Sequence, residues 1–144
     1  MTASKITSTF FLLSVALFIC CLPFNAICSN GNCSAWPAWS MLAFGWIFPA
    51  TLANIAWWAN PALFIAWVCL LRRSAGSFMW GAIAAVLVLL PLVSKTVLLD
   101  ESGFPKRLDG FALGYWLWVA AAEVNLVASL ACLWGSLQSL RARS

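Results

Sequence analysis

Residues 111–134 read FALGYWLWVAAAEVNLVASLACLW, and this stretch decides the fold. A helix needs about 20 apolar residues to cross the hydrocarbon core of a bilayer, so the stretch predicts a transmembrane helix. Its one carboxylate, Glu123, lies near the middle. A charged side chain at that depth costs roughly 2.5–3.5 kcal/mol on insertion scales, so we expect Glu123 to have a partner or a function.

Three more apolar stretches predict transmembrane helices, at about residues 6–27, 51–71 and 78–99. The chain is 64% hydrophobic and 8% charged, with a mean hydropathy of +0.95, which lies outside the range of soluble globular domains. Four spans use more than half of the 144 residues and leave only short loops and tails. We therefore expect an all-α integral membrane four-helix bundle that forms a single polytopic domain over residues 1–144.

The first span has an alternative interpretation as a cleaved signal peptide. Lys5 supplies a weak basic region, and residues 10–22 supply an apolar one. A small residue is needed three positions before a cleavage site, but Phe24-Asn25-Ala26 places phenylalanine there. We therefore expect the segment to be retained as a span.

The apolar segment at residues 38–71 is too long for one transmembrane helix at a rise of 1.5 Å per residue. A break near Pro49 resolves this, because proline removes a helix hydrogen bond and clashes with the preceding turn. Four residues before the break are spaced to share one helical face: Trp36, Trp39, Ala43 and Trp46. They predict a short interfacial helix at about residues 36–48, either in the headgroup region with its tryptophans as anchors or packed on top of the bundle.

The basic residues are distributed unequally between the two sides of the predicted bundle. One side carries Lys5, Arg72, Arg73, Arg141 and Arg143. The other side carries Lys106 and Arg107 together with Asp100, Glu101 and Asp109. Short cytoplasmic loops carry an excess of Lys and Arg. We therefore expect both termini in the cytoplasm and the protein in a bacterial inner membrane.

Cys28 and Cys33 lie in the first predicted outer connection, in the sequence Cys-Ser-Asn-Gly-Asn-Cys. The Asn-Gly pair favours a tight turn. Outside the cytoplasm the compartment is oxidising, so we expect these two cysteines to form a disulfide. We interpret the disulfide as a staple for the loop, and the alternative is a redox-active dithiol.

Four spans, cytoplasmic termini and a cysteine pair in the first outer loop resemble the quinone-linked membrane oxidants of the disulfide-forming pathway. That family carries a C-x-x-C first pair and a second cysteine pair in the second outer loop, which passes electrons onward. This chain has C-x4-C instead, and its second outer loop, residues 100–110, contains no cysteine. The resemblance is therefore one of topology and implies no electron relay.

Counting residues from the outer end of each predicted span places four residues in one layer near the bilayer centre: Asn60, Pro61, Pro91 and Glu123. The prolines leave the carbonyls of Trp57 and Leu87 without helix donors, and at that depth these acceptors need partners within the protein. We expect a hydrogen-bonded cluster there. Glu123 is interpreted either as a proton or ion site or as a polar group that fixes helix register.

Other polar residues in the predicted spans are Asn54, Lys95 and Asn125. Lys95 is close to a helix end and is expected to extend its ammonium to the interface, with Asn54 as its neighbour. Asn125 lies about 200° from Glu123 around the helix and so faces different neighbours. The candidate intramembrane polar site therefore consists of Asn54, Asn60, Lys95, Glu123 and Asn125.

Small residues predict close helix packing at two places. Gly110 and Gly114 match a G-x-x-x-G face at the start of the fourth span, and Gly81 and Ala85 belong to a second small patch in the third. Such patches pack helices inside one bundle or across a dimer, and the motif does not distinguish the two.

Common catalytic and cofactor-binding motifs are absent from the sequence. It has no histidine, no Walker A loop, no G-x-G-x-x-G and no H-E-x-x-H, so we expect no metal, no cofactor and no nucleic-acid partner. The leading hypothesis is a non-enzymatic accessory, regulatory or immunity-type binder of another membrane component, in contact with lipid and with a membrane-protein partner or further copies of itself. The first alternative is a small oligomeric transporter or channel that uses Glu123. The second is a thiol oxidoreductase that uses Cys28 and Cys33.

Overall fold

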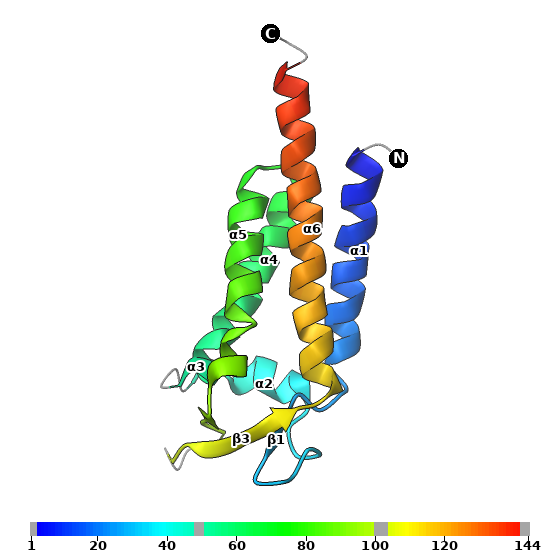
Figure 1. Ribbon diagram of the computed structural model, residues 1–144. Coiled ribbons are helices and arrows are strands. Elements are labelled where there is room, and N and C mark those ends of the chain that lie inside the picture. The colour runs from blue at the N-terminus through cyan, green and yellow to red at the C-terminus, as the bar shows by residue number, and fades with distance from the viewer. Residues whose placement is uncertain (1–2, 48–50, 100–103, 142–144) are drawn as a thin grey trace.

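The computed structural model describes residues 3–47, 51–99 and 104–141. Helices run side by side as a bundle, and a small antiparallel sheet lies at one end, the cap end (Figure 1). α1 begins and α6 ends at the opposite end, which we call the terminal end. The elements in chain order are α1 (Ala3–Cys21), β1 (Ile27–Ser29), α2 (Ala38–Phe44), α3 (Leu52–Ile55), η1 (Ala56–Trp58), α4 (Ala59–Leu71), α5 (Gly76–Leu87), η2 (Leu90–Val93), β2 (Thr96–Val97), β3 (Lys106–Phe111) and α6 (Leu113–Arg141).

Three helical segments of the described chain are long and apolar enough to cross a membrane: Leu52–Leu71, Gly76–Val93 and Leu113–Gln138. The apolar part of α1, Lys5–Cys21, is shorter. α1 stops two residues before Pro23, and proline disfavours helical geometry in the residue before it. The predicted first span at residues 6–27 therefore extended too far, because Ile27 already belongs to β1.

The second apolar segment begins at a capped helix end. The Thr51 hydroxyl accepts a hydrogen bond from the Asn54 backbone N–H at 3.2 Å, which satisfies a donor at the first turn. The helix then tightens into η1 before it resumes as α4, because Pro61 has no N–H to offer the Trp57 carbonyl. The predicted break near Pro49 lies outside the described residues.

The third apolar segment ends earlier than the predicted span at residues 78–99. α5 stops at Leu87 and continues only as the short η2, since Pro91 cannot donate to the Leu87 carbonyl. Thr96 and Val97 form β2, so the end of the predicted span is a strand and Lys95 lies outside any helix.

The expectation of an all-α fold was wrong at the cap end, where three strands pair in the order β1-β3-β2. β3 pairs antiparallel with both neighbours, through Cys28 and Gly110 on one side and Thr96 and Arg107 on the other. Apart from Phe111, β3 occupies residues assigned to the second outer loop. Its charged residues and glycine weakened any strand signal, and one of its partners, β1, lies far away in the sequence.

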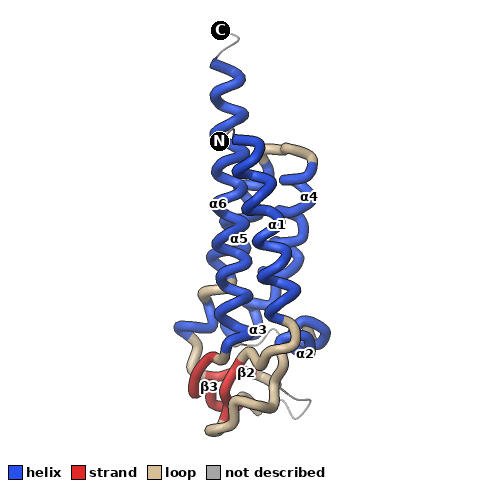
Figure 2. The backbone as a smooth tube through the Cα atoms, turned by 90° about the vertical axis from the view of Figure 1, so that its right-hand side faces the viewer, coloured by secondary structure: helices blue, strands red, loops and turns tan. Residues whose placement is uncertain are grey.

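α2 is the short helix predicted before the second apolar segment, although it covers only Ala38–Phe44. It lies across the cap end of the bundle (Figure 1, Figure 2). The Trp57 indole N–H donates to the Leu42 carbonyl at 2.8 Å, which fixes α2 to the bundle. Trp39 and Trp46 are 53% and 56% exposed, so one side of this segment carries uncovered aromatic surface. The α2 segment thus combines both expectations, because it packs on top of the bundle and also exposes tryptophans.

The bundle is held by close contact between helices with small side chains. α1 lies along α6, α4 along α5, and α5 against α6 (Figure 1). Fully buried alanines recur at these helices: Ala66, Ala84, Ala121, Ala122 and Ala128. A Cβ on Gly81 would lie 3.1 Å from the side-chain nitrogen of Asn125 and from the Ser129 hydroxyl. The small patch around Gly81 thus brings α5 to α6 within one bundle.

The proposed G-x-x-x-G helix face does not exist, because Gly110 lies in β3 and only Gly114 is helical. A Cβ on Gly114 would lie 2.7 Å from the Phe24 carbonyl oxygen and 2.8 Å from that of Asn25. A Cβ on Gly110 would have nothing within 4 Å. Of these two glycines, only Gly114 permits a close approach of the backbone of another segment.

We predict that Gly114→Ala lowers the stability of the protein by about 1–3 kcal/mol, the usual range for overpacking. The added methyl would meet backbone carbonyls that cannot rotate away. Gly110→Ala is the matched control and should leave the thermal unfolding midpoint in detergent unchanged. Equal midpoints for both variants would contradict the close approach at Gly114.

Candidate functional site

Asn60 is the centre of a hydrogen-bonded chain that joins α4 to α6. Its amide nitrogen donates to the Trp57 carbonyl at 3.0 Å. Its amide oxygen accepts from the Trp118 indole N–H at 2.9 Å. Asn60 is 5% exposed, so its side chain supplies inside the protein the donor that Pro61 cannot give.

The Val88 carbonyl, three residues before Pro91, receives a hydrogen bond from the same face of α6. The Leu92 N–H bonds to the Leu89 carbonyl, so the Val88 carbonyl lacks its usual helix donor. The Tyr115 hydroxyl donates to it at 2.8 Å. Sequence reasoning expected a partner for the Leu87 carbonyl instead, and it did not anticipate Tyr115.

Ser14 connects three helices and was also missed. Its hydroxyl donates to the Ala121 carbonyl at 2.7 Å and accepts from the Trp67 indole N–H at 3.0 Å. Ser14 has no exposed surface. A single serine in an apolar helix gave no sequence signal, because its partners lie far along the chain.

Asn54 stabilises the cap end through backbone contacts. Its side-chain nitrogen donates to the Leu98 carbonyl, and its side-chain oxygen accepts from the Leu98 N–H, both at 2.9 Å. Asn54 thus mimics a strand partner for the segment after β2. Lys95, predicted to be its neighbour, is exposed.

Asn125 is buried between α5 and α6 with no exposed surface. Neither its amide nitrogen nor its amide oxygen has a hydrogen-bond partner among the described residues, and the same holds for the hydroxyls of Ser77 and Ser129. Asn125 therefore lies apart from the Asn60 chain. Its angular separation from Glu123 had predicted that the two residues face different neighbours.

Glu123 faces away from the bundle. It shares one helical face of α6 with four large residues that lie four, seven or eleven positions away, and these are exposed: Trp116, Val127, Leu130 and Trp134. Glu123 itself is half-buried. Within the described residues it makes no hydrogen bond or ion pair. The structure therefore does not bring Glu123 into the cluster with Asn60 that its depth suggested.

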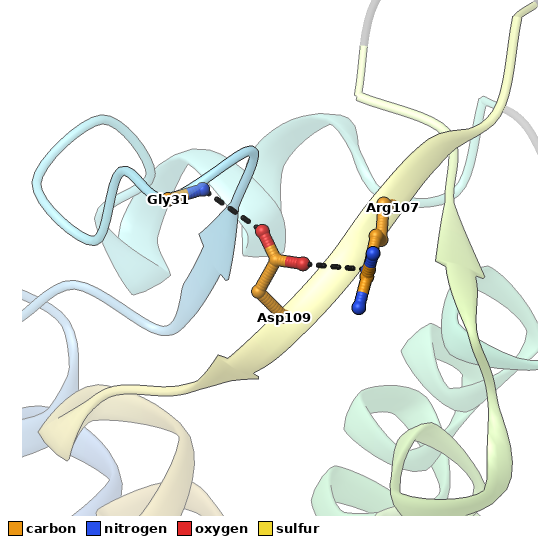
Figure 3. Close-up of polar contacts among 3 residues, drawn as sticks. All are labelled: Gly31, Arg107 and Asp109. Carbon is orange, nitrogen blue, oxygen red and sulfur yellow. Dashed lines mark hydrogen bonds and ion pairs between the residues drawn. The ribbon is translucent and has the colours of Figure 1, made fainter.

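The cysteine loop is fixed to the sheet at the cap end. Cys28 and Cys33 form a disulfide. Between them Asn30 and Gly31 adopt positive φ of 52° and 76°, the geometry that an Asn-Gly turn provides. The Gly31 N–H donates to Asp109 at 2.8 Å, and the other carboxylate oxygen of Asp109 lies 3.0 Å from the Arg107 guanidinium (Figure 3). Asp109 thus joins the loop to β3.

An apolar cavity of about 80 Å³ lies near the cap end of the bundle. Its walls include Asn54, Asn60, Tyr115 and Trp118, whose polar atoms already form the hydrogen bonds described above. Cavities without unpaired polar groups stay dry and bind apolar molecules. Among the described residues, no cluster of His, Cys, Asp or Glu could hold a metal ion.

We predict that Asn60→Leu destabilises the protein, because it removes the side-chain donor of the Trp57 carbonyl and leaves the Trp118 indole N–H without its acceptor. Interhelical hydrogen bonds in membranes average about 0.6 kcal/mol and reach about 1.7, so we expect a loss of roughly 1–2 kcal/mol when the bond to Trp118 and the local bond to Trp57 are both removed. Asn125→Leu is the matched control, since it removes a buried amide that has no described partner and should be neutral or stabilising.

Unfolding of the purified protein in mixed micelles measures both changes. In the double variant Asn60→Leu/Trp118→Phe the loss should be smaller than the sum of the two single losses, because one bond is removed twice. Strict additivity would contradict the Asn60–Trp118 bond.

Comparison of the chain with models of protein families, with curated proteins and with solved structures found no match. Clues to its function therefore lie in the chain itself, above all in the position of Glu123.

Proposed function

We propose that the chain crosses the membrane four times and acts without enzymatic chemistry, as an accessory or regulatory binder of another membrane protein. Three helical segments have sufficient length and apolarity. α1 has 19 residues, which corresponds to about 28 Å at 1.5 Å per residue, close to a hydrocarbon core of about 30 Å. α1 lies along the part of α6 that is nearer the cap end, and this contact supports its assignment as a fourth span (Figure 1).

The distribution of charge supports one orientation of this bundle. Lys5, Arg72, Arg73 and Arg141 belong to the terminal end. Lys95, Lys106 and Arg107 belong to the cap end, where Asp109 pairs with Arg107. The excess of basic residues at the terminal end favours a cytoplasmic location for it. The cap end, with its disulfide, then lies in an oxidising compartment such as the outer side of a bacterial inner membrane.

Glu123 is the observation that carries the proposal. It lies near the middle of the candidate span Leu113–Gln138, on the face that the bundle leaves uncovered. A carboxyl facing lipid at that depth is costly, and a hydrogen-bond donor or a cation on a neighbouring helix offsets the cost. We infer that a transmembrane helix of a partner protein, with such a group at matching depth, packs on this face of α6.

A small oligomeric transporter is the second candidate, because the same outward placement supports it. If copies of the chain met through this face of α6, their Glu123 carboxyls would gather at a shared interface. Such a ring of carboxyls is a usual device of cation channels.

We predict that a photo-activated cross-linking residue at Leu130 captures a membrane-protein partner in cells, since Leu130 lies two turns from Glu123 on the same face. Glu123→Leu should reduce this adduct at least tenfold, because a hydrogen bond to a charged group contributes about 1.5–3 kcal/mol. Glu123→Gln, which keeps hydrogen-bonding capacity, should retain more of it.

The control places the same cross-linker at Val86, which is 64% exposed on α5; its adducts should not respond to Glu123. An adduct of two copies of the chain, with cation flux into liposomes that Glu123→Gln abolishes, would favour the transporter instead. Adducts at Leu130 that are equal in all three proteins would contradict a role for Glu123 in binding.

A further inference from the structure

A groove of about 480 Å³ opens on the bundle near the terminal end. It lies between the first turns of α1, the end of α4 and the last third of α6. Thr7, Ser8 and Arg73 line it toward the terminal end, while Phe11 and Ala131 line it deeper in the bundle. The groove therefore has a polar mouth and an apolar interior.

The groove results from the way the helices pair. α1 packs on α6 and α4 packs on α5, so α1 and α4 meet only over a short stretch. There the Phe18 ring contacts the rings of Phe64 and Trp67, at centroid distances of 5.3 and 5.4 Å. Ser14 accepts its hydrogen bond from Trp67 one turn closer to the terminal end. Beyond this contact the two helices leave the groove between them.

Arg73 occupies a backbone position that favours glycine. Its φ is 52°. The Ser74 N–H bonds to the Cys69 carbonyl at 2.9 Å and the Arg73 N–H to the Leu70 carbonyl at 3.0 Å, which is the Schellman ending of a helix with Arg73 as its left-handed residue. A non-glycine residue is strained there. Strain that a fold retains points to a function for the side chain, and this side chain lines the groove.

No acidic side chain of the described residues lies at the terminal end, where Arg73 is. Lys5 and Arg72 are exposed at the same end. The chain has four acidic residues, and three of them follow the third apolar segment or lie in β3, while Glu123 is in the middle of α6. Arg73 makes no ion pair within the described residues. The acidic side chains of the described residues therefore supply no anion to this groove.

We propose that the groove binds the headgroup of an anionic phospholipid. The Arg73 guanidinium would bind the phosphate, because its planar donors match phosphate oxygens. The Ser8 hydroxyl is a second donor at the mouth, and an acyl chain would follow Phe11 into the apolar part. The inference rests on the orientation proposed above only in placing this groove in the cytoplasmic leaflet, where basic residues near the surface attract anionic lipids.

Native mass spectrometry of the full chain in detergent tests the proposal with short-chain phosphatidylglycerol as the probe. Retention of phosphatidylglycerol should exceed that of phosphatidylcholine at least tenfold. Arg73→Gln and Arg73→Gly should both remove this preference. Arg73→Gly should also keep or raise the thermal unfolding midpoint, since glycine relieves the left-handed strain, so lost binding could not be attributed to unfolding.

Arg72→Gln is the matched control, because it removes the same charge from the adjacent residue, which does not line the groove. It should retain the preference for phosphatidylglycerol. Equal losses for Arg72→Gln and Arg73→Gln would overturn the site in favour of diffuse attraction. Inorganic phosphate competing as well as the lipid would overturn the lipid assignment. Glu123→Leu should leave binding unchanged, which separates this inference from the proposed partner interface.

Discussion

A backbone carbonyl that loses its helix donor in an apolar medium must find another donor within the protein, and the packing of this chain follows from that requirement. Pro61 and Pro91 each interrupt a helix. Tyr115 and Trp118, one turn apart on α6, compensate for both interruptions. Tyr115 donates directly to the Val88 carbonyl, and Trp118 donates to Asn60, which in turn donates to the Trp57 carbonyl. One face of α6 thus fixes the rotation and depth of two neighbouring helices, so the prolines determine how the bundle is assembled.

The cap end solves a different problem. Chain segments that leave the helices carry unpaired backbone groups, and the three-stranded sheet, α2 and Asn54 together satisfy them. The disulfide and Asp109 fix the cysteine loop to the same sheet. The described parts of the cap-end connections therefore form one layer across the helices rather than two independent loops, with Trp39 and Trp46 on its exposed surface.

Apolar runs made the helices predictable, because a stretch long enough to span a bilayer has few other stable structures. The strands were not predictable, because β1 pairs with β3 across a large sequence separation, Ile27 with Phe111, and β2 is only two residues long. Pro91 was noticed for the carbonyl it frees, whereas its larger effect is to end α5. Glu123 lies near the centre of its helical segment, but position along a helix does not give the direction in which a side chain points. The direction was present in the sequence: bulky Trp116, Val127, Leu130 and Trp134 share the face of Glu123, while small residues occupy the opposite one.

The pairing of α1 with α6 has a consequence for biosynthesis. A ribosome releases the N-terminal helix first, yet the partner that covers most of it and accepts the bond from Ser14 is the last helix to emerge. β3, which pairs with both β1 and β2 at the cap end, is also made just before that last helix. The first helix therefore lacks the Ala121 carbonyl that accepts from Ser14 until translation is almost complete. Packing of α1 on α6 is thus a late step, whereas α4 and α5, which also contact each other, are made before α6.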